Sequence, residues 1–191
     1  MPIIVVGGSS KNVGKTALVC GLIAALPEFA WTAVKITSHE HGKAESIWEE
    51  TAAGTETDTA RYLAAGARRA FLISTDDADL PFRLGELQAK LEAGAHLIFE
   101  SNRILQHVQP DIFLAVEGGP QSEEKLSFRE VAHPMTARVV RGELDFVSAG
   151  ATPLFQLAAL DRISAEMQLW IRERLADHRD ATQQDTVRRF R

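Results

Sequence analysis

The chain has 191 residues, of which 45% are hydrophobic and 25% charged, proportions that exclude an intrinsically disordered protein. The formal net charge of −5 at pH 7 argues against nucleic acid as a partner, because binding to a phosphate backbone needs a basic surface. A single cysteine excludes an intramolecular disulfide and a cysteine-based zinc site, which fits a cytoplasmic protein. We find no signal peptide and no apolar run approaching the ~20 residues of a membrane span, so we expect no membrane association.

Short apolar runs alternate with amphipathic stretches along most of the chain. The apolar runs predict strands at 3–6, 31–36, 71–74, 97–100, 112–116 and 144–148. Apolar residues at helical spacing predict helices at 15–26, 58–65, 82–91 and 164–175. Strands that are apolar throughout and separated by helices indicate a parallel sheet covered on both faces. The two stretches 38–55 and 120–143 lack either period and are predicted to be loops or irregular insertions.

The order of these elements indicates one domain. Its expected extent is residues 1–176, with a core at 1–116 and a C-terminal extension at 117–176 that ends in the closing helix. Residues 177–191 are polar and are predicted to form a flexible tail.

A glycine-rich segment between the first strand and the first helix carries the strongest functional signal. It ends in Gly14-Lys15-Thr16, the ending of a phosphate-binding P-loop, and it stands in the strand–loop–helix context that this motif requires. Backbone N–H groups and the helix N-terminus would hold phosphate oxygens, Lys15 would reach the β and γ phosphates, and Thr16 would ligate Mg²⁺. The strict pattern puts its first glycine at position 9, where this chain has serine, so Gly8 supplies it with one additional loop residue. The segment predicts a three-layer α/β/α P-loop NTPase fold, with phosphate bound by Gly8, Ser9, Ser10, Lys11, Asn12, Val13, Gly14, Lys15, Thr16 and Ala17.

Three further polar residues lie where neighbouring strands or helices meet the same sheet edge. Lys35 ends the second strand and is assigned, with Lys15, a catalytic role toward the phosphates, its alternative being a lysine that reaches solvent at the sheet rim. Glu100 ends an apolar strand as a Walker B carboxylate does and is a candidate Mg²⁺ ligand together with Thr16. Asp58 begins a helix, so it is either a third metal ligand or an acid in the first helical turn.

Other polar residues near these positions carry weaker signals. Asn102 and Arg103 follow the Glu100 strand and are expected to line the site. His39 and His41 flank Glu40 after the second strand, either as part of the site or as polar residues of a loop, and no third ligand completes a zinc spacing.

The residues after the P-loop resemble the MobB family, the adaptors of molybdopterin-guanine dinucleotide biosynthesis. The likeness covers roughly residues 3–116 and is carried by Ala33-Val34-Lys35, the His39/His41 loop, the segment from Thr57 through Gly66-Ala67, and Leu97-Ile98-Phe99-Glu100. It implies a GTP-binding protein, usually a homodimer, that works with a molybdenum-cofactor biosynthetic protein. It also implies phosphate and Mg²⁺ roles for Gly14, Lys15 and Thr16, and extends such roles to Lys35, Asp58 and Glu100.

Two departures from that family, a P-loop one residue longer and an unmatched C-terminal extension beyond Val116, leave alternatives open. The longer P-loop is similar to that of dethiobiotin synthetase, which likewise ends Val-Gly-Lys-Thr and uses a lysine after its second strand, an Asp and a Glu. That resemblance implies ATP and a ligase or small-molecule kinase instead of GTP and a slow NTPase. The guanine-reading Asn-Lys-x-Asp motif is absent from the sequence, so GTP rests on the MobB resemblance alone. A nucleotide-switched adaptor without significant hydrolysis is the third interpretation.

Overall fold

The computed structural model describes residues 1–38, 46–118, 128, 134–141, 152–157 and 162–181, with the backbone alone at 141 and 177–181. Its strands are β1 (Ile3–Gly8), β2 (Thr32–Thr37), β3 (Ser46–Glu50), β4 (Arg69–Ser74), β5 (Leu97–Glu100), β6 (Ile112–Glu117), β7 (Ala137–Arg141) and β8 (Leu154–Leu157). Its helices are α1 (Lys15–Ala25), α2 (Asp58–Ala64), α3 (Leu80–Lys90) and α5 (Ala165–Ala181), with short 3₁₀ turns η1 (Pro27–Phe29) and η2 (Arg103–Gln106).

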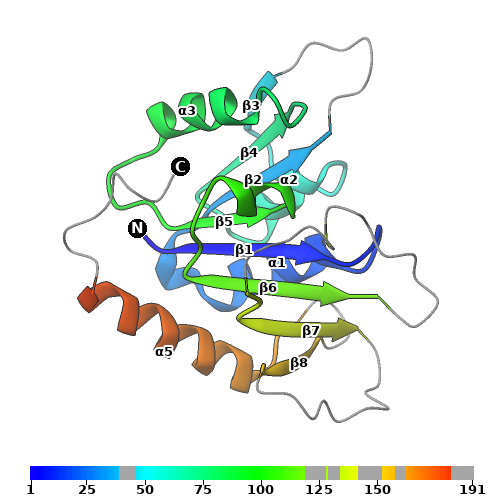
Figure 1. Ribbon diagram of the computed structural model, residues 1–191, viewed down its shortest axis with the longest axis vertical. Helices are drawn as coiled ribbons and strands as arrows, with labels where there is room; N and C mark the ends of the chain where they lie inside the picture. Colours follow the sequence, from blue (N-terminus) through cyan, green and yellow to red (C-terminus); the bar gives the residue numbers. More distant parts are fainter. Residues whose placement is uncertain (39–45, 119–127, 129–133, 142–151, 158–161, 182–191) are drawn as a thin grey trace.

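All eight strands join one sheet in the order β3-β4-β2-β5-β1-β6-β7-β8 (Figure 1). Each neighbouring pair is parallel except β3 and β4, which run antiparallel at one edge. The predicted α/β fold with a mostly parallel sheet is therefore confirmed.

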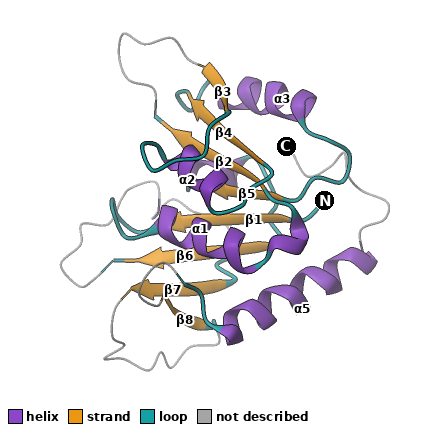
Figure 2. Cartoon of the chain, turned by 180° about the vertical axis from the view of Figure 1, so that it is seen from behind, coloured by secondary structure: helices purple, strands orange, loops and turns teal. Residues whose placement is uncertain are grey.

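Side-chain alternation along the strands creates two separate cores. Ile4 and Val6 of β1 face one side of the sheet, where α1, α2 and α5 pack, as Figure 2 shows from behind. Ile3 and Val5 face the other side, which is covered by α3 and η2. Both faces are buried, which explains why β1 reads as an unbroken β-branched run.

Local sequence signals set the ends of the helices. The Thr57 hydroxyl accepts a hydrogen bond from the Ala60 N–H at 3.0 Å and so caps the start of α2. Gly66 follows that helix with φ +105°, a left-handed conformation that ends helices and favours glycine. Pro27 follows α1 and begins η1, because proline cannot continue a helix.

Three strands were missed by the sequence interpretation. The segments predicted as loops at 38–55 and 120–143 contain β3 and β7, and β8 had no predicted counterpart. β3 and β8 are edge strands, so their side chains are mixed and carry no continuous apolar signal. β7 is inside the sheet, but it is only five residues long, and the residues at its two ends are small or charged. The strand predicted at 144–148 lies outside the described residues.

Two helix boundaries also differ from prediction. Helix α3 begins at Leu80 and not at Phe82, because Pro81 is accommodated in the first turn, where no intrahelical N–H bond is needed. Helix α5 continues to Ala181, beyond the predicted end at 175 and into the segment expected to be a flexible tail.

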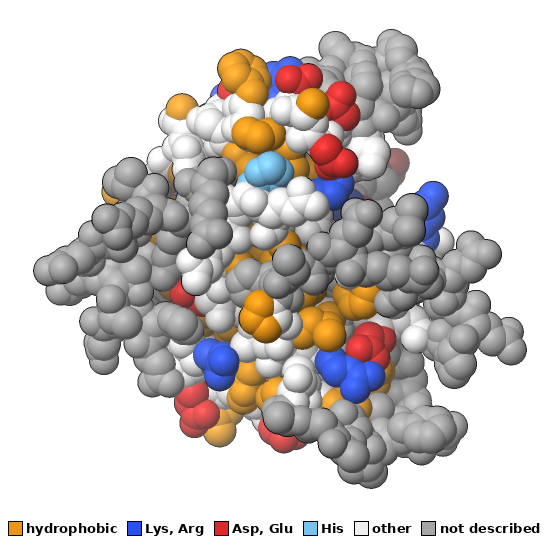
Figure 3. Space-filling view, viewed as in Figure 1, with side chains coloured by type: hydrophobic (Ala, Val, Ile, Leu, Met, Phe, Trp, Pro, Cys, Tyr) orange, Lys and Arg blue, Asp and Glu red, His pale blue; other side chains and the backbone are white. Residues whose placement is uncertain are grey.

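Charged side chains of both signs lie on the surface of the described residues. On the face shown in Figure 3, basic side chains are scattered among acidic ones and form no broad basic patch. No helix in the described part of the chain is long and apolar enough to cross a membrane.

Candidate functional site

A cavity of about 660 Å³ opens at the carboxyl edge of the sheet, where β1, β5 and β2 end. Ligands of open α/β sheets bind at this edge. The cavity is lined by residues of the P-loop, of β2 and the residues after it, of α2, and of the turn after β5: Lys11, Asn12, Gly14, Lys15, Thr16, Ala17, Lys35, Ile36, Thr37, Ser38, Asp58, Arg61, Glu100, Ser101, Asn102 and Arg103.

The additional residue of the P-loop lies in the sheet and not in the loop. β1 extends through Gly8, which pairs with Val116 of β6, and the Ser9 N–H still donates to the Val116 carbonyl at 2.9 Å. The Ser9 hydroxyl then accepts a hydrogen bond from the Gly118 N–H at 2.8 Å. The loop that leaves the sheet therefore begins at Ser9, which stands in the position of the first glycine of the common motif.

The loop backbone turns back on itself before α1. Asn12 has φ +58°, and Gly14, the residue that precedes the helix, has φ +103°. These left-handed conformations turn successive N–H groups toward one side, which is the geometry of an anion-binding nest. The buried side chain of Val13 anchors the loop in the core beneath. Because α1 carries no acidic residue in its first turn, its N-terminus stays favourable for an anion.

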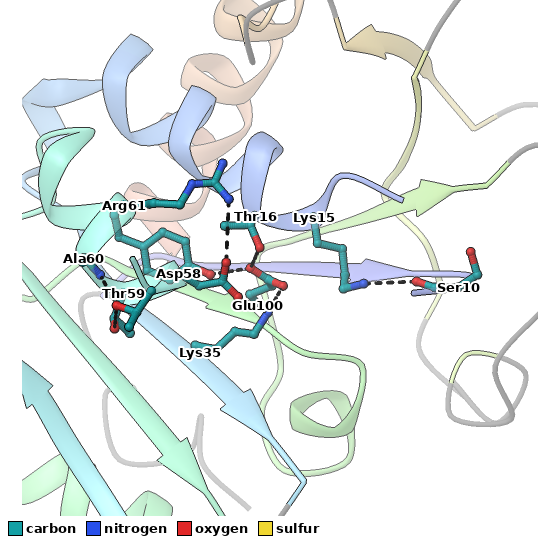
Figure 4. Close-up of polar contacts among 11 residues, drawn as sticks. Ser10, Lys15, Thr16, Lys35, Asp58, Thr59, Ala60, Arg61 and Glu100 are labelled. Atoms are coloured by element: carbon teal, nitrogen blue, oxygen red, sulfur yellow. Dashed lines mark hydrogen bonds and ion pairs between the residues drawn. The ribbon is translucent and has the colours of Figure 1, made fainter. Parts of the chain in front are cut away.

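Lys15 folds back over the loop that precedes it. Its Nζ donates to the Ser10 carbonyl at 3.2 Å, as Figure 4 shows. A Cβ atom at Gly8 would lie 2.9 Å from Lys15 Cδ and 2.8 Å from Val13 Cγ2, closer than real Cβ contacts. A side chain at position 8 would therefore force the Lys15 or Val13 side chain to shift.

Asn102 fixes the backbone at the end of β1. Its Oδ1 accepts from the Gly8 N–H at 2.8 Å and its Nδ2 donates to the Gly8 carbonyl at 3.1 Å. Both bonds are buried, so Asn102 holds the strand end from which the P-loop starts. The sequence placed Asn102 near the site, but not this role.

We expect Asn102→Ala to lower the free energy of unfolding by about 1–3 kcal/mol, because the buried Gly8 N–H loses its acceptor. Nucleotide affinity should fall as well, since the loop start is released. Denaturant unfolding and calorimetric titration measure the two effects. An unchanged unfolding midpoint would show that the Gly8 contacts are dispensable.

Glu100 is the centre of the polar network in the cavity (Figure 4). Only 2% of the residue is exposed, and its carboxylate accepts from the Thr16 hydroxyl at 2.8 Å. Lys35 Nζ and the Tyr62 hydroxyl also donate to it at short distance. The parallel register between β2 and β5 places Lys35 directly opposite Glu100. Lys35 reaches Asp58 as well, at 3.0 Å, so it bridges the two acids.

These contacts shift two pKa values in the network. Burial disfavours the charge of Lys35, but Glu100 and Asp58 outweigh burial and raise the Lys35 pKa above its ordinary 10.5. Lys35 is therefore cationic at neutral pH, and the stability gained from its charge is lost only as the pH rises through that raised pKa. Burial and the Glu100 charge raise the Tyr62 pKa well above 10.0, so the phenol stays protonated and donates.

Removing the Tyr62 hydroxyl tests whether it positions Glu100. We expect Tyr62→Phe to reduce the free energy of unfolding by about 1.5–3 kcal/mol, the usual contribution of a hydrogen bond to a charged group. The ring remains to fill the core, so the fold should persist. A fall below 0.5 kcal/mol in chemical denaturation, as a rough limit for surface substitutions, would argue against a positioning role.

The structure brings most predicted site residues together. Six of the ten P-loop residues line the cavity, whereas Gly8, Ser9, Ser10 and Val13 do not. Lys35, Asp58 and Glu100 all line the same cavity. His39 and His41 lie outside the described residues. The sequence interpretation missed Arg61 and Tyr62, although both share a helix face with Asp58 at spacings of three and four.

The oxygen atoms near Thr16 are suited to a small divalent cation. Mg²⁺ binds through hydroxyl and carboxylate oxygens together with substrate phosphates, and Thr16 and Glu100 supply the first two kinds. Asp58 forms an ion pair with Lys35 at 3.0 Å, and Lys35 links it to Glu100. No group of three or more His, Cys, Asp or Glu side chains gathers within the described ranges, so a metal here would depend on phosphate oxygens.

The chain is similar in structure to a protein of known structure, but not in sequence to a known family. No protein-family model matches the chain, and no curated protein matches it in sequence. A crystal structure of the "apo" form of LpxK from Aquifex aeolicus, in complex with ATP, has a TM-score of 0.49 and 18% sequence identity. The match covers 82% of this chain and 53% of that chain, so the present chain spans about half the length of LpxK.

Proposed function

We propose that the chain binds a purine nucleoside triphosphate together with Mg²⁺ in the cavity at the carboxyl edge of the sheet. The observation that carries this proposal is the joint placement of the P-loop, with Lys15 folded over it, beside a buried network of Thr16, Glu100 and Lys35. Phosphate-binding loops need both parts: donors for phosphate oxygens and oxygen ligands for the cation.

Each residue has a distinct task in this proposal. Lys15 would exchange the Ser10 carbonyl for phosphate oxygens, and the α1 N-terminus would add its N–H groups and partial positive charge. Bound Mg²⁺ would supply charge neutralisation of the phosphates, held by Thr16 and Glu100. Lys35 would stay cationic beside Glu100 and stabilise negative charge that develops on the transferred phosphoryl oxygens.

The MobB resemblance extends the proposal to GTP, to slow hydrolysis and to a role in molybdenum-cofactor biosynthesis with a protein partner. It also extends to a homodimer. These finer assignments are supported by the likeness of residues 3–116. No contact among the described cavity residues supports them. We propose a cytoplasmic location from the single cysteine and the composition of the chain.

A second candidate function is an ATP-dependent ligase or small-molecule kinase of the dethiobiotin-synthetase type. The observation that favours it is the number of cationic side chains in the cavity: five lining residues are Lys or Arg, and two are acidic. A nucleotide-switched adaptor needs only the P-loop and the Mg²⁺ ligands, so it does not explain why the cavity has further cationic side chains.

Phosphate release from GTP and from ATP, each with Mg²⁺, separates these functions. The slow NTPase predicts release from GTP without additions. The ligase or kinase predicts preference for ATP and stimulation by a small acid or amine. The adaptor predicts nucleotide binding with little phosphate released over hours, and absence of binding to either nucleotide would overturn all three.

A further inference from the structure

Lys35 lies between two carboxylates at the edge of the cavity. Its Nζ donates to Glu100 Oε1 and lies 3.0 Å from Asp58 Oδ2, so one ammonium group bridges the two acids (Figure 4). The parallel register of β2 and β5 fixes this placement, because it pairs Lys35 with Glu100. A metal ion bound by either acid would therefore need an oxygen atom that Lys35 already contacts or an atom beside it.

The carboxylate of Glu100 has little accepting capacity left. A carboxylate offers about four lone-pair positions, two on each oxygen. The Thr16 and Tyr62 hydroxyls both donate to Oε2, and Lys35 donates to Oε1. A metal ion that binds Glu100 directly would therefore share Oε1 with Lys35, at a separation where two cations repel each other strongly.

The charges of the two acids are balanced by cations of the chain itself. Lys35 contacts both acids, and Arg61 Nη1 lies 3.8 Å from Asp58 Oδ1. Two carboxylates and two cations have no net charge, so a divalent cation gains little attraction at this place. Only 1% of the Glu100 side chain and 19% of the Lys35 side chain are exposed, so water and salt screen these charges weakly.

We propose that Lys35 is a built-in counter-ion that keeps a divalent cation from Glu100 until an anionic ligand enters the cavity. The inference rests on the proposed function, because it takes Glu100 as a ligand of the cation. It adds the order of events to that function: the chain alone binds the cation weakly, and the cation and the anion bind together.

An anion would change the balance through Lys35 itself. Lys35 lines the cavity, and an ammonium group has three N–H donors. Glu100 and Asp58 take two of them, and the third has no partner among the residues that the structure describes. The negative charge of an anion in the cavity attracts Lys35 and the cation alike. Each ligand then strengthens the binding of the other by the same factor.

The test measures the binding of Mn²⁺ alone to the full chain without nucleotide, by calorimetry and by the electron paramagnetic resonance of the free ion. Mn²⁺ prefers the same oxygen ligands as Mg²⁺. Lys35→Met removes the ammonium group, Lys35→Gln removes the charge but keeps an N–H donor, and Lys35→Arg keeps the charge. Lys90→Met is the matched control, because Lys90 ends α3 and does not line the cavity.

We expect Lys35→Met and Lys35→Gln to bind one Mn²⁺ per chain about 10-fold or more tightly than the wild type, because an opposing charge is removed. Lys35→Arg and Lys90→Met should stay within about threefold of the wild type. Combining Glu100→Gln with Lys35→Gln should abolish the gain, because the ion loses its carboxylate. Should Lys35→Met fail to fold, Lys35→Gln decides alone.

A second measurement follows the coupling between cation and anion. The β,γ-imido analogue of ATP or GTP is titrated with and without saturating Mn²⁺, and the gain in affinity on adding Mn²⁺ is compared between chains. We expect this gain to be about 10-fold or more larger in the wild type than in Lys35→Gln, because Mn²⁺ already binds the variant without nucleotide.

The inference is overturned if neither neutral Lys35 variant binds Mn²⁺ more tightly than the wild type, or if Lys35→Arg or Lys90→Met gains as much. It is also overturned if the gain persists with Glu100→Gln, or if the two chains gain equally from Mn²⁺ in the second measurement. Failure of the wild-type chain to bind any nucleotide with Mg²⁺ would instead contradict the proposed function. The titrations with Mn²⁺ alone would still decide whether Lys35 keeps the cation from Glu100.

Discussion

Replacing Lys15 by alanine lowers the affinity for the Mg²⁺–nucleotide by about 100-fold or more. Lys15 is the side chain that lies over the P-loop, and with phosphate bound it would make at least two charge-assisted hydrogen bonds. Each contributes about 1.5–3 kcal/mol, so their combined loss of ~3 kcal/mol or more corresponds to at least two orders of magnitude. Calorimetric titration measures the change.

The control for this variant is Lys90→Ala. Lys90 ends α3, on the sheet face opposite to α1, and does not line the cavity. Its removal should leave nucleotide affinity unchanged. Equal affinities of the wild type and the Lys15 variant would disprove the P-loop assignment, and equal losses in both variants would indicate a non-specific charge effect.

Replacing Glu100 by alanine reduces the free energy of unfolding by about 3–5 kcal/mol, the usual effect of removing one member of a buried ion pair. Lys35 and the Tyr62 hydroxyl would both lose a buried acceptor, and Thr16 would lose the carboxylate that orients its hydroxyl. The variant should also bind nucleotide with no gain from added Mg²⁺. Chemical denaturation and titrations with and without Mg²⁺ measure these two consequences.

Glu100→Gln separates the two effects, since it keeps the size of the side chain and can still accept hydrogen bonds. We expect it to lose less stability than Glu100→Ala while losing the Mg²⁺ dependence equally. A Glu100→Ala chain that unfolds within about 1 kcal/mol of the wild type would contradict the central position given to this carboxylate.

The P-loop side of the candidate site could be predicted from sequence because its signals are local. The P-loop is a contiguous segment, and Lys35 and Glu100 each end an apolar strand, so parallel pairing places them at one edge. Lys35 contacts two carboxylates. The alternative interpretation, a lysine that only reaches solvent at the sheet rim, does not account for these contacts.

Other features depend on distant contacts and could not be predicted in this way. Tyr62 occupies a position typical of an ordinary core residue, and only the packing of α2 on the sheet shows that its hydroxyl meets Glu100. Arg103 gains its place from carbonyls at the ends of β2 and β4, which no spacing in the sequence indicates. The edge strand β3 was missed for a related reason, since an edge strand buries too little to show a hydrophobic pattern.

The measurement that tests the central claim most directly is a paired calorimetric titration of the wild-type chain with GTP and with ATP, each in the presence and absence of Mg²⁺. The proposed function predicts one nucleotide per chain, bound more tightly with Mg²⁺ than without it, and the MobB resemblance predicts the tighter binding for GTP. Equal affinity for the two nucleotides would remove the GTP assignment and leave the P-loop site in place. If a chain shown to be folded gives no heat of binding with either nucleotide, the nucleotide-binding site itself is contradicted.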